Sequence, residues 1–436
     1  MKHGKHSKMI INEDNDLDIV SSTKKRKKND EDIILSKTPK GRKVYDLITK
    51  LLFALEMLLV IALVIHATVI ELFPMVYIFI LVALLGVLAG IHIWLLSGKK
   101  KRFKTKRTIS LVLSIIVFMV SAFGMSYMGL IDNAIGDLAL GEEENENQVE
   151  NIAKNPFVVY LSGLDTRNSG EIAEKGLSDV NMVIAVNPEQ KRVLMISTPR
   201  DYYVALDGDP NKMDKLTHAG SYGIECSMKT LENLYDIKFN YYAKINFKSV
   251  HDIVDAVGGV TVNSDFDFYS RYSFTKKKYH FVKGENQLTG DAALAFARER
   301  KSFANGDRQR GIHQQKVIKA VVEKAISPSM LIPANIESML KAISDNTKTN
   351  FSVDEIKDLV KYQMKSMKKG WDFQTMSVDG TGGYAYTYSY SRQQLYVMRP
   401  NEETVNEAKE ALQAVINGEP LPSETESEVS STAGAQ

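Results

Sequence analysis

The chain has 436 residues, of which 44% are hydrophobic and 25% are charged, and its formal net charge is +2. These averages resemble those of a soluble protein, but the charge is unevenly distributed. Residues 1–131 carry 20 Lys and Arg against 10 Asp and Glu, whereas residues 132–436 carry 35 against 43. Opposite charge in two parts of a chain indicates two environments or two kinds of partner. The single cysteine, Cys226, excludes an intramolecular disulfide and any zinc site with two sulfur ligands.

Three apolar stretches near the amino terminus are long enough to cross a bilayer, which takes about 20 helical residues. They run from Leu47 to Ile70, from Leu72 to Leu96 and from Ile109 to Ile131. The first stretch begins too far into the chain, and is too long, for a cleaved signal peptide. We therefore predict a cytoplasmic basic tail over residues 1–46 and three transmembrane helices over residues 47–131.

Basic residues flank these helices on one side only. They gather in residues 24–43 and in the loop 97–108 between the second and third helices, whereas acidic residues follow the third. Because Lys and Arg stay in the cytoplasm, we expect a multi-pass plasma-membrane protein with its amino terminus inside and residues 132–436 outside. The basic run 24–28 also fits a nucleic-acid patch, but an arm that contacts anionic membrane lipids is the simpler interpretation.

The first apolar stretch contains two ionisable residues, Glu56 and His66. They fit a proton relay within the membrane. The alternative is that Glu56 pairs with a neighbouring helix while His66 lies near the outer interface. Neither interpretation makes these two residues the main chemistry of the protein.

The remainder of the chain predicts one domain over residues 157–418. Residues 141–156 are acidic and amide-rich, which predicts a flexible stalk over 132–156, and residues 419–436 predict a disordered tail. Short β-rich runs and helical patterns alternate between them, so an α/β/α layered fold is expected. The runs are Phe157–Leu161, Val180–Val186 and Val193–Ile196, and the helical patterns are Met228–Tyr235, Ser249–Val257, Gln314–Ala325 and Val353–Met367.

Two aspartates lie at the ends of the first two predicted strands. Asp165 follows the first strand and Asp179 immediately precedes the second. If these strands are antiparallel neighbours, the two carboxylates converge, and carboxylates together with substrate phosphates commonly hold Mg²⁺. Asp is also a common turn residue, so a structural role is the alternative.

Arginines gather in three polar segments of the domain. They are Arg200 in STPRDYY, Arg298 and Arg300 in ALAFARERK, and Arg308 and Arg310 in NGDRQRGIHQQK. Guanidinium groups bind phosphate oxygens in pairs, and a helix N-terminus adds positive partial charge, so a phosphorylated ligand is expected here. The alternative is a surface network in which these arginines pair with Asp201, Glu299 and Asp307.

Glycines and histidines of the domain favour structural roles. Gly258 and Gly259 end a predicted helix in a left-handed cap, and no phosphate-loop Lys follows them. His218 and His313 show no paired spacing that would indicate a metal site.

Nine sequence blocks between residues 157 and 327 resemble, in order, the LytR-CpsA-Psr family. Its capsule-associated CpsA (Wzg) branch is the most similar, and the three predicted membrane helices also resemble that branch. The blocks are VVYLSGLDTR, LSDVNMVIAVNP, VLMISTPRDYYV, DKLTHAGSYG, TLENLY, YYAKINF, IVDAVGGVTV, ALAFARERK and GDRQRGIHQQK.

This resemblance implies a membrane-anchored α/β enzyme at the surface of a Gram-positive type of bacterium. The enzyme would transfer a glycopolymer, in this branch capsular polysaccharide, from a polyprenyl-pyrophosphate carrier to peptidoglycan at the C6 hydroxyl of N-acetylmuramic acid. The carrier lipid would occupy an apolar tunnel between the sheet and the helices. The implied partners are this lipid-linked polymer, peptidoglycan, membrane lipids and the capsule synthesis machinery, with no nucleic acid.

The resemblance also assigns roles by motif position. Asp165 and Asp179 would hold Mg²⁺, with Mn²⁺ as an alternative. The pyrophosphate would be bound by Arg200, Arg298, Arg300 and Arg310, with Gln314. Asp307 and Gln314 would position these arginines, and Asp307 would also be a candidate base beside Arg298 and Arg300 in catalysis.

The chain departs from the family pattern at Leu177. The family places Arg two residues before the second aspartate, and Leu cannot bind phosphate, although Lys175 lies nearby. The loss of one charge-assisted contact costs about 1.5 to 3 kcal/mol, which slows an enzyme more readily than it abolishes activity.

Two other functions compete with the transferase. A non-catalytic membrane adaptor would bind the lipid-linked polymer and regulate capsule assembly. A transcription regulator would need a DNA-binding fold inside the cell, and the predicted cytoplasmic segments show no helix-turn-helix pattern.

Overall fold

The computed structural model describes residues 39–70, 73, 75–97, 103–138, 147–164, 172–271, 277–304, 306–331, 333–366 and 370–422. The chain forms two compact units. The first comprises Met1–Val69 and Met75–Ser126, and the second comprises Ile70–Pro74 and Tyr127–Gln436. Each unit is described by itself.

Three long helices build the first unit: α2 (Pro39–Val69), α3 (Met75–Leu96) and α4 (Phe103–Leu138), of which the part from Tyr127 belongs to the second unit. Each contains a segment long and apolar enough to cross a membrane, at the three places where the sequence predicts a span. The helices extend beyond those spans, and α4 begins inside the segment predicted as the loop 97–108. Lys and Arg favour helices, so the helical backbone continues past the apolar residues.

A buried polar cluster joins the three helices. Ser114 Oγ donates a hydrogen bond to Glu56 Oε2 at 2.7 Å, and His92 Nδ1 lies 3.3 Å from Glu56 Oε1. His92 Nε2 lies 2.8 Å from the Ser110 carbonyl oxygen. Glu56 therefore pairs with both neighbouring helices, as one of the two interpretations of this residue predicts. Its partner is His92 of α3, which the sequence patterns did not single out.

A six-stranded sheet in the order β11-β6-β1-β2-β3-β12 forms the centre of the second unit. β1 pairs with β2, β2 with β3 and β6 with β11 in antiparallel fashion, whereas β1 with β6 and β3 with β12 are parallel. The three predicted strands are confirmed as parts of β1, β2 and β3. The bounds are β1 (Phe157–Leu164), β2 (Ser178–Asn187), β3 (Arg192–Thr198), β6 (Tyr241–Asn246), β11 (Thr347–Thr349) and β12 (Asp372–Ser377).

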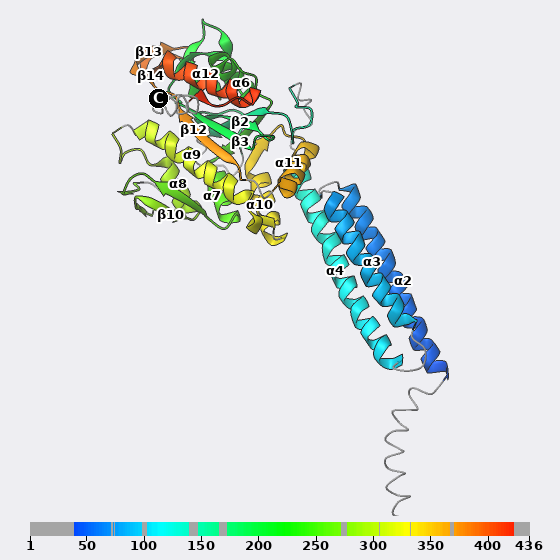
Figure 1. Ribbon diagram of the computed structural model, residues 1–436. Helices are drawn as coiled ribbons and strands as arrows, with labels where there is room; N and C mark the ends of the chain where they lie inside the picture. Colours follow the sequence, from blue (N-terminus) through cyan, green and yellow to red (C-terminus); the bar gives the residue numbers. More distant parts are fainter. Residues whose placement is uncertain are drawn as a thin grey trace, which may run out of the picture. The chain divides into compact units, whose positions relative to one another are not determined.

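Helices cover both faces of this sheet, which confirms the predicted α/β/α arrangement (Figure 1). On one face, Tyr160 and Val183 pack with α5 (Leu216–Ala219), α6 (Ile224–Tyr235) and α12 (Glu402–Asn417). On the other face, Leu161 and Met182 pack with α9 (Gly306–Ala325). Successive strand residues point to opposite faces, so strands covered on both sides are apolar throughout.

A second core lies beside the sheet. It is built by α7 (Phe247–Ala256), α8 (Gly290–Arg298), α9 and the pair of strands β7 (Val260–Ser264) and β10 (Gly284–Leu288). The other elements of the unit are α10 (Pro333–Asn346), α11 (Val353–Ser366) and three antiparallel pairs of strands. These pairs are β4 (Tyr203–Ala205) with β5 (Met213–Lys215), β8 (Phe268–Tyr269) with β9 (His280–Phe281), and β13 (Gly380–Thr387) with β14 (Tyr390–Pro400).

Local sequence signals determine where α7 begins and ends. The Asn246 side chain accepts a hydrogen bond from the Ser249 backbone nitrogen, and Ser249 Oγ accepts one from the Asn246 backbone nitrogen. This reciprocal cap starts the helix at Phe247. Gly258 and Gly259 follow the helix with φ values of 78° and 84°, which confirms the predicted left-handed turn.

The flexible-stalk prediction is wrong for residues 147–156. Ile152 is only 1% exposed and packs, together with Val149, against Phe157 and Tyr241. These two apolar residues are enough to anchor a segment whose composition is otherwise polar. Likewise, Leu421 of the predicted tail is buried in the core beside α12.

Candidate functional site

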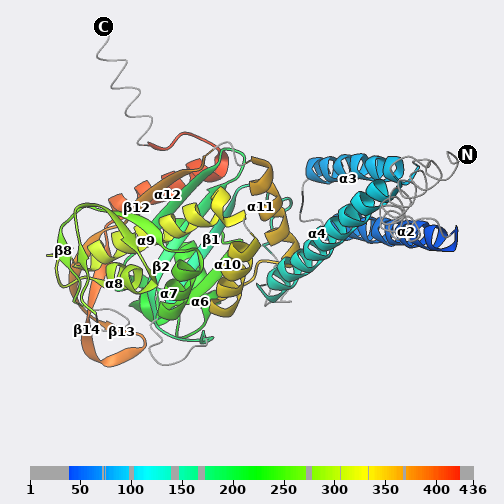
Figure 2. The ribbon, with the colours of Figure 1, turned by 90° about the horizontal axis from the view of Figure 1, so that it is seen from below.

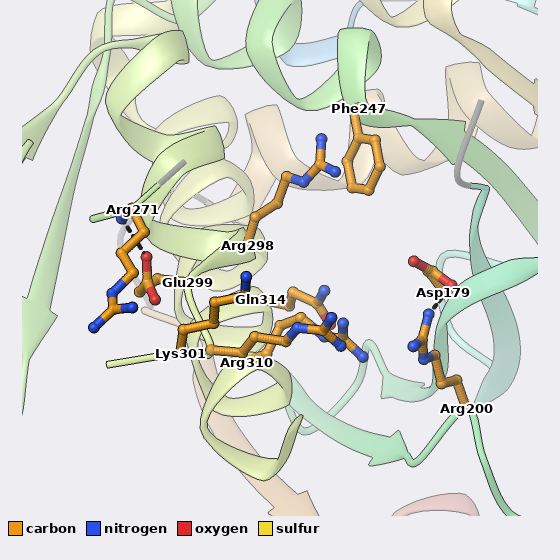
Figure 3. A pocket seen from close by; sticks show the side chains of 10 residues that line it. Asp179, Arg200, Phe247, Arg271, Arg298, Glu299, Lys301, Arg310 and Gln314 are labelled. Atoms are coloured by element: carbon orange, nitrogen blue, oxygen red, sulfur yellow. Dashed lines mark hydrogen bonds and ion pairs between the residues drawn. The ribbon is translucent and has the colours of Figure 1, made fainter. Parts of the chain in front are cut away.

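A cavity of about 410 Å³ lies in the second unit where strand ends and helix ends meet (Figure 3). Antiparallel pairing of β2 with β3 brings Asp179, near the start of β2, close to Arg200, which follows β3. The end of α8 and the segment after it supply Arg298, Glu299, Arg300 and Lys301, and α9 supplies Arg310 and Gln314. The lining residues are Asp179, Arg200, Phe247, Arg271, Arg298, Glu299, Arg300, Lys301, Arg310 and Gln314.

The lining is strongly cationic. It contains six cationic side chains and two carboxylates, in a part of the chain whose net charge is negative. One of these carboxylates, Glu299, is 2% exposed and accepts hydrogen bonds from the backbone nitrogens of Arg271 at 2.5 Å and Ser302 at 3.0 Å. Glu299 therefore organises the backbone beside the cavity. The arrangement favours a multiply charged anion.

Two contacts orient arginines of the cavity. Arg200 Nη1 donates a hydrogen bond to Asp179 Oδ1 at 2.7 Å, as Figure 3 shows. The Arg298 guanidinium carbon lies 3.6 Å from the centroid of the Phe247 ring. A guanidinium stacked on an aromatic ring keeps its plane fixed, which prepares it for paired hydrogen bonds to phosphate oxygens.

Close backbone approach places the N-terminus of α9 at the cavity. A Cβ atom at Gly306 would lie 2.2 Å from the Arg300 carbonyl oxygen, so only glycine allows the helix to start against that segment. Similarly, a Cβ atom at Gly311 would lie 2.9 Å from Ser197 Oγ of β3. The positive end of the helix dipole thus adds to the charge of the arginines.

The LytR_cpsA_psr family model matches residues 133–407 of this chain. The protein belongs to this family. Within it, a transferase of Bacillus anthracis, named polyisoprenyl-teichoic acid–peptidoglycan teichoic acid transferase TagU, is 39% identical over 235 residues, which are 53% of this chain and 73% of the relative. The protein of the same name from Enterococcus faecalis is 34% identical over 295 residues, 66% of this chain and 93% of the relative.

Solved structures of similar proteins agree on the fold. TagV of Bacillus subtilis superimposes with a TM-score of 0.50 at 29% identity, over 61% of this chain and 98% of the relative. A Streptococcus agalactiae protein superimposes with a TM-score of 0.51 at 26% identity, over 60% of this chain and 88% of the relative. The second unit therefore has the LytR-CpsA-Psr fold.

The structure brings together most of the residues that the family motifs nominated. Six of them line the cavity: Asp179, Arg200, Arg298, Arg300, Arg310 and Gln314. Asp165 lies outside the described residues. Asp307 lies in the first turn of α9, but the structure does not describe its side chain.

The described ion pairs fit the surface-network alternative at two of the arginines, Arg200 and Arg308. Arg308 Nη1 lies 2.9 Å from Asp379 Oδ2, and Arg200 Nε lies 3.6 Å from Asp201 Oδ2. Asp201 also pairs with Lys215 Nζ at 2.8 Å. Glu299 bonds backbone nitrogens, as described above, while Arg298 and Arg300 line the cavity.

Sequence reasoning missed Arg271, Lys301 and Phe247. Arg271 lies in the loop after β8 and reaches the cavity because Glu299 binds its backbone, which is a tertiary contact. Phe247 had a usable signal, since it follows the Asn246 cap directly at the start of a helix.

An apolar pocket adjoins the charged cavity. It shares Phe247, Arg298 and Gln314 with the cavity and has a volume of about 40 Å³. Its other walls come from the sheet and from α7, α8 and α9. They are Gly163, Leu164, Val180, Ile245, Asn246, Val250, Leu294, Ala297, Val317 and Ile318. The pocket lies between the sheet and the helices, where the apolar tunnel is expected.

Leu177 lies outside the charged cavity, where a phosphate-binding residue would be expected. Its side chain is 49% exposed and lines a hollow with His218, Tyr222 and Tyr390. It is not among the residues that line the charged cavity. Replacement of the family arginine by leucine thus leaves the six cations of the cavity in place.

The carboxylate chemistry of the site fits a divalent cation that phosphates help to bind. Asp179 lines the cavity, and its neighbour Ser178 pairs with Leu164, the last residue of β1. Among the described residues, no cluster of three His, Cys, Asp or Glu is present. A metal held by Asp165 and Asp179 therefore needs substrate oxygens to complete its coordination.

The two histidines make structural contacts. His313 is fully buried, stacks on Phe268 and Phe296, and bonds the Phe296 carbonyl oxygen through Nδ1 at 3.1 Å. Burial lowers its pKa from 6.5 to about 4, so the ring is neutral at physiological pH. His218 Nδ1 lies 2.6 Å from Asp214 Oδ1.

Proposed function

We propose that the protein is a phosphotransferase that attaches a glycopolymer from a polyprenyl-pyrophosphate carrier to peptidoglycan. The observation that carries this proposal is the cationic cavity, which adjoins an apolar pocket across Phe247, Arg298 and Gln314. A pyrophosphate linked to a polyprenyl chain has the same two parts, a compact polyanion beside an apolar tail. The relatives support it, since their names describe the transfer of a polyisoprenyl-linked teichoic acid to peptidoglycan.

The proposed reaction transfers a phosphoryl group to a sugar hydroxyl. The acceptor oxygen attacks the phosphorus that carries the glycopolymer, and the bond from this phosphorus to the bridging oxygen breaks. Polyprenyl phosphate leaves, the polymer becomes linked to the acceptor through a phosphodiester, and the hydroxyl proton passes to a base. Such a reaction asks the protein mainly to orient the reactants and stabilise developing negative charge.

The arginines of the cavity provide that stabilisation. Arg200 is held by Asp179 and Arg298 by Phe247, so both guanidinium groups are oriented before the substrate binds. Arg300 and Arg310 add charge where the N-terminus of α9 meets the cavity. Asp307 in the first turn of α9 is the proposed base, and Gln314, about two turns further along, positions the neighbouring arginines.

We also propose that Asp165 and Asp179 hold Mg²⁺, or Mn²⁺ in its place, together with phosphate oxygens. A bound cation would neutralise charge on the pyrophosphate. The location of the reaction is the outer face of the plasma membrane, because the basic flanks of the helices favour a cytoplasmic amino terminus.

The decisive experiment is ligation by the purified full-length protein in detergent. Peptidoglycan is incubated with polyprenyl-pyrophosphate-linked polymer, with and without Mg²⁺, and the attached polymer is measured after muramidase digestion. Parallel reactions with capsular polysaccharide and with teichoic acid as the polymer decide which class is transferred. Binding of the lipid-linked polymer without any ligation would instead identify a non-catalytic adaptor.

A further inference from the structure

The hairpin β13–β14 carries an unusual group of exposed aromatic rings. Five tyrosines of this hairpin, and Tyr222 from the adjacent loop, are between 42% and 66% exposed. The hairpin residues are Tyr384, Tyr386, Tyr388, Tyr390 and Tyr396. Figure 2 shows the hairpin looping out from the edge of the second unit. These six tyrosines are called the tyrosine surface below. Contiguous exposed aromatic groups on a folded domain indicate a binding surface.

Hydrogen bonds to the body of the domain fix the hairpin. The Ser389 backbone nitrogen donates to Asp214 Oδ2 at 2.7 Å, and the Tyr388 backbone nitrogen donates to the Met213 carbonyl oxygen at 2.9 Å. Tyr203 Oη also donates to the Tyr386 carbonyl oxygen at 3.0 Å. A surface that is already ordered loses little conformational entropy when a ligand binds.

Two hollows lie on either side of Tyr222, whose ring centroid is 6.3 Å from that of Tyr388. The first, of about 380 Å³, includes Tyr222 and Tyr388. The second, of about 550 Å³, includes Tyr222 and Tyr390. The remaining lining of the second hollow is Leu177, His218, Ser221, Ser389, Gln393 and Leu395.

The lining of the second hollow matches an uncharged saccharide. Tyrosine rings and leucines offer apolar faces for the C–H faces of pyranose rings, while hydroxyl and amide groups offer hydrogen bonds to sugar hydroxyls and N-acetyl groups. Its lining contains one basic side chain, His218, and no carboxylate, and the His218 ring already pairs with the buried Asp214. The first hollow also contains Lys212 and Lys229, but Lys212 pairs with Asp209 at 3.3 Å and Lys229 pairs with Asp207 at 3.7 Å. An anionic polymer would have to compete with these carboxylates, so an uncharged saccharide fits better.

The tyrosine surface is continuous with the cationic cavity. Leu177 of the second hollow lies two residues before Asp179, which lines the cavity. In addition, Tyr396 and Met398 of β14 line a pocket that also includes Arg200 and Arg310. A chain of sugars along β14 would therefore reach the phosphate-binding side chains.

We propose that the tyrosine surface binds the glycan strand of peptidoglycan, that is, alternating N-acetylated hexosamines, and thereby presents the acceptor hydroxyl to the cavity. This inference rests on the proposed transferase function and adds the acceptor site to it. The pyranose rings stack on Tyr222, Tyr388 and Tyr390, and the strand extends along β14 toward Asp179.

The experiment measures binding of soluble glycan strands, released from peptidoglycan by an amidase, to the full-length protein in detergent. Tyr390→Ala and the double variant Tyr388→Ala/Tyr390→Ala remove rings at the tip of the surface. We expect affinity for the glycan to fall roughly tenfold for the single variant and further for the double variant. Tyr390→Phe keeps the ring and should bind within about twofold of the parent.

A matched control and a second ligand make the result specific. Tyr269→Ala removes an exposed tyrosine of β8, 56% exposed, that lies outside the tyrosine surface, and it should leave glycan affinity unchanged. Arg298→Ala should retain glycan binding and lose binding of polyprenyl pyrophosphate. If glycan binding depends on the tyrosines but Arg298→Ala still binds the carrier lipid, the acceptor surface is supported. Only the proposed carrier site in the cavity is then contradicted.

Other outcomes overturn the inference. Unchanged glycan affinity in the folded double variant, checked by its melting temperature, would exclude the tyrosine surface as the acceptor site. Loss of binding to polyprenyl pyrophosphate or to phospholipid vesicles, with intact glycan binding, would assign the surface to a lipid instead.

Discussion

Arg298 combines two contacts that make it the most informative single residue of the cavity. It ends α8, and its guanidinium stacks on Phe247 beside the apolar pocket. We predict that Arg298→Ala lowers affinity for polyprenyl pyrophosphate by about 10- to 100-fold, because a charge-assisted pair of hydrogen bonds is lost. Arg298→Lys should recover only part of this, since Lys lacks the planar fork. The measurement is titration of the purified full-length protein with the lipid.

Arg192→Ala is the matched control for this experiment. Arg192 begins β3, at the opposite end of the strand from Arg200, and pairs with Asp372 at 3.4 Å. Its removal changes net charge by the same amount and should leave lipid affinity unchanged. Equal losses in both variants would mean that binding responds to overall charge and not to the cavity.

At the scale of one element, α9 couples stability to pH through His313. The neutral ring is buried in the fold, whereas in the unfolded chain it takes a proton below about pH 6.5. Falling pH therefore stabilises the unfolded state, and the free energy of unfolding should decrease by up to about 3 kcal/mol between pH 6.5 and pH 4. Urea unfolding at several pH values, followed by Trp371 fluorescence in a Trp94→Phe background, measures this decrease.

His313→Asn separates this contribution from the rest of the domain. An Asn amide nitrogen can still donate to the Phe296 carbonyl oxygen, but the side chain does not titrate. The variant should be less stable at pH 7 and lose less stability on acidification to pH 4. The Asp252 carboxyl titrates below the window from pH 6.5 to pH 4. Burial raises its pKa, but Lys248 and His251 have the larger combined effect and lower its pKa below 3.8. An unchanged pH slope in the variant would show that another group is responsible.

The stability of the bundle of α2, α3 and α4 depends on its buried polar cluster. Glu56→Ala leaves His92 and Ser114 without their carboxylate partner among the helices. We predict a loss of about 1 kcal/mol in stability, typical of a hydrogen-bonded contact within a membrane bundle. Thermal unfolding in detergent, followed by Trp94 fluorescence in a Trp371→Phe background, reports on this unit alone. Leu58→Ala, at a 65% exposed position of α2, should change the melting temperature little.

The elements differ in how well the sequence predicts them. The apolar runs of β1, β2 and β3 are visible because each strand is buried on both faces. Hairpin β13–β14 alternates tyrosines with small residues from Tyr384 to Ser391, but these tyrosines are exposed, so the pattern marks no buried face. Motif positions located Asp179 and the arginines, but Arg271 joins the cavity only through Glu299, a contact that no local pattern encodes.

For the whole molecule, the distribution of charge predicts where each part lies. The basic segments 24–43 and 97–108 should remain in the cytoplasm, and the second unit, with its cationic cavity, should face outward. A transferase that joins a lipid-linked polymer to peptidoglycan needs this orientation, because peptidoglycan lies outside the membrane. The opposite orientation would separate the proposed site from its acceptor.

Cysteine labelling of intact cells measures this orientation. Burial raises the pKa of the Cys226 thiol, which slows its reaction, and Cys226→Ser removes it altogether. In that background, Glu150→Cys should react with a membrane-impermeant maleimide, because Glu150 is exposed in the second unit. Ser22→Cys, in the basic tail, should react only after the cells are permeabilised. The reverse pattern would place the cavity inside the cell, where it has no access to peptidoglycan, and the proposed transferase function would fail with it.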